Sequence, residues 1–122
     1  MNLLLQTSQL DLQEQIAITG SKSETNRLLL LQALYPNITL ENTSNSDDSE
    51  VMQKALVGKD EIVDIHHAGT AMRFLTAYFA VNEGREVVLT GSQRMTERPI
   101  KVLVEALQQL GAKITYEKED GY

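Results

Sequence analysis

Positively charged side chains stand at three places where the backbone itself is expected to attract anions. The segments GSKSETNR (20–27), HAGTAMR (67–73) and SQRMTERP (92–99) each lead into an expected helix. Backbone N–H groups make the start of a helix positive, so cations there are unfavourable unless a negative ligand accompanies them. We therefore expect a site for a small molecule with several phosphate or carboxylate groups. Five of the eleven Lys and Arg residues lie in these segments, namely Lys22, Arg27, Arg73, Arg94 and Arg98.

Each segment also has a purely structural interpretation. Ser21 and Glu24 have the spacing of a capping box, which needs no ligand. Arg73 could pair with an acidic residue, and the pair Arg94 and Arg98 could form an exposed helix edge. Taken one at a time, these interpretations compete with the anion site, and only the recurrence of the pattern favours a ligand.

Two other groups of polar residues resemble sites but have simpler explanations. His66 and His67 are adjacent, and neighbouring residues of a strand point to opposite faces, so they would not hold one ion together. No third ligand has a suitable spacing, and we expect no metal. Asp47 and Asp48 fit the first turn of a helix, where acids complement the helix dipole.

Composition limits the function classes that the chain can serve. Its 122 residues, 42% of them apolar, can form one modest core or part of a larger one. There is no cysteine and hence no disulfide framework or thiolate metal site. A net charge of −6 argues against a nucleic-acid surface, and no apolar run approaches the length of a membrane span. We expect a cytoplasmic protein whose anion site is local.

Short β-branched runs alternate with helical patterns, which predicts a mixed α+β fold. Four consecutive leucines, 28–31, point around more than half of a helix, so that helix is expected to be buried on several sides. The expected strands are 3–6, 15–19, 37–42, 61–66, 86–90 and 113–118, and the expected helices are 22–35, 47–57, 70–82 and 99–110.

Local signals set the expected helix ends. A second capping box is predicted at Asp47 and Glu50, and Pro99 suits a first helical position. Glycines at 58, 84 and 111 stand where helices are expected to end.

The ordered motifs GSKSETNR, SDD, AGTAMR and RMTERPI resemble the N-terminal part of the EPSP synthase (3-phosphoshikimate 1-carboxyvinyltransferase) family, from Gly20 to about Gly111. The related enolpyruvyl transferases that act on UDP-N-acetylglucosamine are similar in fold, but the strings KSETNR and TAMR favour the shikimate enzyme. The resemblance implies domains built from βαβαββ units with buried helices. It places residues 1–19 in strands of the other, C-terminal domain and residues 20–122 in the first part of the N-terminal substrate-binding domain, which is incomplete.

The same resemblance implies a reaction and a set of binding residues. The family joins 3-phosphoshikimate to phosphoenolpyruvate and releases phosphate, with no metal or organic cofactor. Lys22, Ser23 and Arg27 would bind 3-phosphoshikimate. Lys22, Gly69 and Arg98 would bind phosphoenolpyruvate, with Arg73 and Arg94 in support, and Asp48 would orient Lys22. His67, Thr25 and Phe74 depart from residues that are common in the family, namely Asn, Ser and Pro.

The family's catalytic acids and bases lie later in a much longer chain, so we expect no catalytic residue here beyond supporting roles for Lys22 and Asp48. The chain is accordingly expected to be an inactive fragment that lacks its C-terminal part and can self-associate through exposed surface. Two other functions remain open from the residues alone. One is a complete, noncatalytic phosphate-binding module, and the other is an interaction domain whose cations pair with its own acids.

Overall fold

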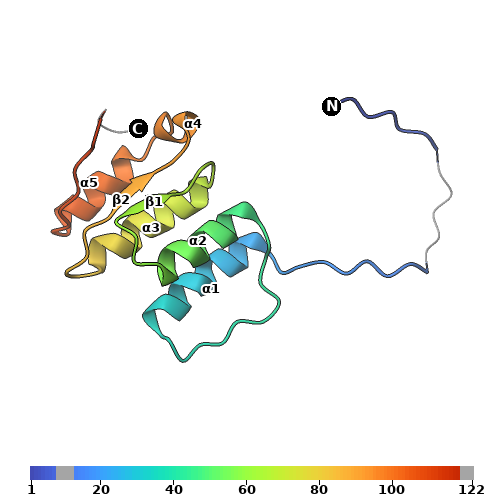
Figure 1. Cartoon of the computed structure of the whole chain (residues 1–122), viewed down its shortest axis with the longest axis horizontal. Helices are drawn as coiled ribbons and strands as arrows, with labels where there is room; N and C mark the ends of the chain where they lie inside the picture. Colours follow the sequence, from blue (N-terminus) through green and yellow to red (C-terminus); the bar gives the residue numbers. More distant parts are fainter. Residues whose placement is uncertain (8–12, 119–122) are drawn as a thin grey trace.

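A computed structural model of the chain describes residues 1–7 and 13–118. Helices and short strands alternate along it, which confirms the predicted α+β class (Figure 1). In order, the elements are α1 (Lys22–Leu34), α2 (Asp47–Val57), β1 (Ile62–Asp64), α3 (Gly69–Val81), β2 (Val88–Thr90), α4 (Gln93–Thr96) and α5 (Lys101–Gln109).

The two strands form a parallel pair, with α3 as the connection between them. The register pairs 62 with 88, 63 with 89 and 64 with 90. Two backbone hydrogen bonds continue the contact beyond the strands, from Ile65 N to Thr90 O at 2.9 Å and from Ser92 N to His66 O at 3.0 Å. The loops that follow β1 and β2 therefore stay together where they lead into α3 and α4.

Helices α1, α2 and α3 pack against one another and run in the same direction, so their N-terminal ends lie toward one side of the molecule (Figure 1). Ser21 caps α1 by accepting a hydrogen bond from Glu24 N at 3.5 Å, as its spacing predicted. The alignment brings the positive ends of three helix dipoles to the same side of the fold.

One predicted cap and one predicted helix start are wrong. Helix α2 spans 47–57 as predicted, but its cap is Ser46, which accepts from Ser49 N at 3.4 Å, and Asp47 is already the first helical residue. Helix α5 begins at Lys101 rather than Pro99. A separate short helix, α4, ends before it at Thr96, and its four residues are too few to show a helical period.

One hydrophobic core joins the helices to the sheet. Leu75 of α3 and Met52 of α2 are fully buried, as is Ile65 just after β1. Burying a side chain of this size contributes about 1.5–3 kcal/mol relative to exposure. The core therefore fixes the helix starts relative to the strand ends. Its members are Leu29, Met52, Ala55, Val63, Ile65, Ala68, Ala71, Leu75 and Met95.

The predicted strands at 3–6, 15–19, 37–42 and 113–118 are absent from the structure. Each has the composition of a strand, but a strand forms only when its N–H and C=O groups find a partner strand, and none of the four pairs within the described residues. The assignment of residues 1–19 to another domain stays a prediction, and positions 8–12 of that range lie outside the described residues.

The burial predicted for the four leucines is also only partly correct. Leu29 is buried, Leu28 and Leu30 are half-buried, and Leu31 is 43% exposed. The reason is that α1 packs chiefly against α2 and, less extensively, against α3, which leaves part of its circumference uncovered. Among residues 1–7 and 13–118, no helix has the length and apolar character that a membrane crossing requires.

Candidate anion-binding site

The starts of α1 and α2 place an ammonium group beside a carboxylate. Lys22 Nζ lies 3.7 Å from Asp48 Oδ2, and the Lys22 side chain is about half exposed whereas that of Asp48 is only 16% exposed. Lys22 belongs to the first turn of α1 and Asp48 to the first turn of α2, where the acid also complements the helix dipole. The arrangement holds a cation at a helix start while leaving it open to solvent and ligands.

A buried polar network fixes these two helix starts to each other. Ser49 Oγ donates to Asn26 Oδ1 at 2.7 Å and lies 3.0 Å from Ser46 Oγ, while Thr25 Oγ1 accepts from Ser44 N at 2.9 Å. Asn26 is fully buried. The sequence reasoning assigned no role to Asn26 or Ser49. A signal was present, because Asn26 shares a helix face with the buried Leu29 and a polar side chain there needs a partner.

Ser23 and Arg27 lie one turn apart on the exposed surface of α1. Arg27 Nη1 donates to the backbone oxygen of Ser23 at 2.7 Å. The guanidinium carbon of Arg27 lies 5.8 Å from the centre of the Phe74 ring, within the range of a cation–π contact. Since Phe74 belongs to α3, this contact places the guanidinium of Arg27 against the neighbouring helix.

At the start of α3, a buried glycine leaves room for an arginine. A Cβ atom added to Gly69 would collide with Nη1 of Arg98 and would lie 2.9 Å from its Cζ atom. Any larger residue at position 69 would push the guanidinium away. Gly69 is the first residue of α3, so the charge of Arg98 is held against a helix N-terminus.

Arg73 ties this helix start to the loop that carries Arg98. Its Nη1 donates to Gly69 O at 3.0 Å and its Nη2 donates to Pro99 O at 2.9 Å. Both terminal nitrogens are thus already bonded to backbone carbonyls. Arg73 is therefore suited to position the loop rather than to bind a ligand directly.

Arg94 and Arg98 line a cavity of about 390 Å³ together with His67 and Met95. The cavity lies where the loops after β1 and β2 meet, and none of its four lining residues carries a carboxylate. Two guanidinium groups without a lining acid favour a negatively charged occupant, because each would otherwise remain uncompensated. Lys22, Ser23 and Arg27 do not line this cavity, so a shared hollow for all predicted site residues stays a prediction.

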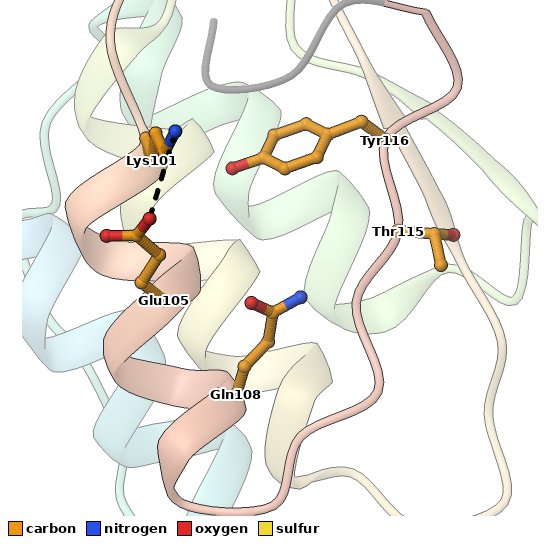
Figure 2. Close-up of a pocket in the computed structure, with 5 residues that line it drawn as sticks. All are labelled: Lys101, Glu105, Gln108, Thr115 and Tyr116. Atoms are coloured by element: carbon orange, nitrogen blue, oxygen red, sulfur yellow. Dashed lines mark ion pairs between the residues drawn. The ribbon is translucent and has the colours of Figure 1, made fainter.

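A second cavity of about 500 Å³ has a different character. Figure 2 shows Lys101, Glu105 and Gln108 of α5 on one side and Thr115 and Tyr116 on the other. Lys101 Nζ lies 3.9 Å from Glu105 Oε1, so the single cation of this cavity already has an acidic partner. It lacks the uncompensated charge of the first cavity.

The two adjacent histidines engage different partners. His66 Nδ1 lies 3.8 Å from Asp64 Oδ2, whereas His67 Nδ1 lies 2.8 Å from Ser92 Oγ. Within residues 1–7 and 13–118, no group of three or more His, Cys, Asp or Glu side chains is arranged to hold a metal ion.

Comparison with known proteins relates the chain to one enzyme family. A family model described as EPSP synthase (3-phosphoshikimate 1-carboxyvinyltransferase) matches residues 49–122. A 3-phosphoshikimate 1-carboxyvinyltransferase of Bacteroides fragilis (strain YCH46) is 47% identical over 108 residues, covering 88% of this chain and 26% of the relative. Those of Buchnera aphidicola subsp. Baizongia pistaciae and Paraburkholderia phytofirmans are each 40% identical, over 88% of this chain and 31% and 30% of their own. The chain thus spans about a quarter to a third of the curated relatives that it matches.

Proposed function

Because this chain belongs to the EPSP synthase family, we propose that it forms part of the substrate site of a 3-phosphoshikimate 1-carboxyvinyltransferase. The reaction transfers the enolpyruvyl group of phosphoenolpyruvate to the 5-hydroxyl of 3-phosphoshikimate and releases inorganic phosphate. It is a step of the shikimate pathway, which leads to aromatic amino acids. Both substrates carry a phosphate and a carboxylate, which suits a site built from arginines and lysine.

The contact between Gly69 and Arg98 carries this proposal. It places a guanidinium group, with no acid among its cavity neighbours, against the first turn of α3. A guanidinium can donate two parallel hydrogen bonds to a carboxylate or phosphate, and the helix N-terminus adds unpaired N–H groups. We therefore assign phosphoenolpyruvate to Gly69 and Arg98. The family resemblance adds Lys22 to its site, although Lys22 does not line this cavity. Arg94 adds charge at the cavity, and Arg73 holds the loop in place through Gly69 O and Pro99 O.

The exposed end of α1 is assigned to 3-phosphoshikimate. Lys22, Ser23 and Arg27 lie within the first two turns of the helix and offer an ammonium group, a hydroxyl and a guanidinium. Asp48 fixes Lys22 from the start of α2, at 3.7 Å. Lys22 is thereby shared between the two substrates, and the substrates supply the negative charge that the helix starts lack.

Ligand selectivity tests the proposal. Calorimetric titration of the 122-residue chain with 3-phosphoshikimate, phosphoenolpyruvate and inorganic phosphate is expected to show binding of 3-phosphoshikimate that Lys22→Ala and Arg27→Ala each weaken at least tenfold. Loss of one charge-assisted hydrogen bond accounts for a change of that size. Equal binding of all three anions would instead indicate a general phosphate-binding module. Absence of any binding would contradict the proposed site.

We also propose that the chain by itself does not complete the reaction. Enolpyruvyl transfer needs proton donors and acceptors beside the reacting carbons of phosphoenolpyruvate, and we assign none among Lys22, Asp48 and the arginines. A phosphate-release assay of the purified chain with both substrates is expected to give no signal above a protein-free control. Turnover that depends on both substrates would contradict this proposal.

A further inference from the structure

His67 is a cavity residue to which the substrate assignments give no role. It follows Ile65 and His66 in the loop after β1, and its ring lines the same cavity as Arg94 and Arg98. Its Nδ1 atom lies 2.8 Å from Ser92 Oγ, so one ring nitrogen is engaged by the protein. The other ring nitrogen, Nε2, can therefore bond to an occupant of the cavity.

The hydrogen bonds of Ser92 are compatible with a ring that carries its hydrogen on Nε2. Ser92 Oγ caps α4 by accepting from Met95 N at 3.3 Å. Its own hydroxyl hydrogen can then be donated to His67 Nδ1, which makes Nδ1 an acceptor and leaves the hydrogen of the neutral ring on Nε2. Because the hydroxyl oxygen has a second lone pair, it could also accept from an N–H at Nδ1, and it is an anion beside Arg94 and Arg98 that selects the tautomer donating from Nε2.

We propose that His67 is a further anion-binding residue of this site, donating a hydrogen bond from Nε2 to the phosphate or carboxylate group that Arg94 and Arg98 attract. This inference rests on the proposed function, because it assigns the cavity to phosphoenolpyruvate. The histidine adds a hydrogen-bond donor to two cations, and its contact with Ser92 orients the ring.

The backbone around His67 is held in a way that suits this role. Ser92 N donates to His66 O at 3.0 Å, and a Cβ at Gly91 would lie only 2.8 Å from the same oxygen. His66 itself has a φ of 48°, a conformation that most side chains avoid. Because the two loops fix His67 before any ligand arrives, little conformational entropy would be lost on binding.

Nitrogen NMR of the His67 ring tests the tautomer directly. The ¹⁵N shifts are expected to identify Nε2 as the nitrogen that carries the hydrogen and Nδ1 as an acceptor. Phosphoenolpyruvate and inorganic phosphate are then expected to shift the Nε2 signal. A neutral ring with its hydrogen on Nδ1 would overturn the inference.

Two substitutions test the ring donor. The amide of Gln reaches roughly the position of Nε2, whereas Leu has no hydrogen-bond donor, so His67→Leu is expected to weaken phosphoenolpyruvate binding about tenfold and His67→Gln less than threefold. His66→Asn is the matched control, since Asn tolerates the positive φ and His66 does not line the cavity. Wild-type binding by both His67 variants would overturn the inference.

An NMR titration of the chain with phosphoenolpyruvate distinguishes failure of this inference from failure of the proposed function. A response to phosphoenolpyruvate at Gly69 and Arg98 without one at His67 Nε2 would overturn only the role of His67. No response at any of the three residues would overturn the phosphoenolpyruvate site itself.

Discussion

At the scale of single residues, the site depends on the absence of a side chain at Gly69. Gly69 is buried at the start of α3, and the space that a Cβ would occupy is filled by the guanidinium of Arg98. The residue types could be chosen from the sequence, because cations at helix starts are unusual. Their contacts could not, since no local spacing relates Gly69 to Arg98. The family resemblance, which the comparisons confirm, supplied that pairing.

Gly69→Ala is expected to weaken phosphoenolpyruvate binding about tenfold without destabilising the fold. The added Cβ meets the far end of an exposed arginine side chain, which can move, and Ala suits a helix better than Gly by up to about 1 kcal/mol. Calorimetric titration and thermal unfolding of the same variant measure the two effects.

Gly84→Ala is a control variant for which we expect the reverse, a loss of stability without a loss of binding. Gly84 has open space around it but a φ of 78°, so Ala is expected to lower the free energy of unfolding by about 1 kcal/mol and leave ligand binding unchanged. If Gly69→Ala loses stability as Gly84→Ala does, or keeps full affinity, the role assigned to Gly69 is wrong.

At the scale of elements, every helix but the short α4 was predictable and most strands were not. A helix forms its backbone hydrogen bonds within itself, so caps and apolar spacing place its ends to within one or two residues. A strand needs a partner, and four predicted strands, at 3–6, 15–19, 37–42 and 113–118, have none in the described residues. The two that form, β1 and β2, are joined through α3 and share one core with it.

The cap of α2 gives a prediction at this scale. Ser46→Ala is expected to lower the free energy of unfolding by about 1–2 kcal/mol, because Ser46 caps the helix and contacts Ser49, which bonds to the buried Asn26. Asp47→Ala is the matched control and removes only a first-turn charge, at about 0.3–1 kcal/mol. Chemical denaturation of both variants measures the difference, and a larger loss from Asp47→Ala would contradict the assignment of the cap.

At the scale of the whole molecule, opposite ends of the helices differ in character. The N-terminal ends of α1, α2 and α3 lie toward one side of the molecule (Figure 1), and Lys22 stands at the start of α1 while Arg98 contacts Gly69 at the start of α3. Large apolar side chains are exposed near the other ends, where the described part of the chain provides no cover. They are Leu31, Leu34, Tyr35, Val57, Val81 and Leu110. The cytoplasmic location of the protein and the division of the chain between two domains at residue 19 stay predictions from the sequence.

We expect the chain to self-associate through this apolar surface at high concentration, because exposed apolar side chains gain free energy when they are removed from water. Sedimentation velocity is expected to show a sedimentation coefficient that rises with concentration, and Leu34→Lys is expected to reduce the rise. A single monomer species over the whole concentration range would contradict this expectation.

The central claim is that cations at the aligned helix starts bind phosphoenolpyruvate, and a matched pair of arginine variants tests it most directly. Arg98→Gln removes the cation held against Gly69. Arg85→Gln removes a cation near the far end of α3, a helix of 13 residues or about 20 Å, where Arg85 contacts Phe79 and Asp60 O. In calorimetric titration with phosphoenolpyruvate, the account predicts at least a tenfold loss of affinity for Arg98→Gln and none for Arg85→Gln. Equal affinities for both variants and the wild-type chain would contradict it.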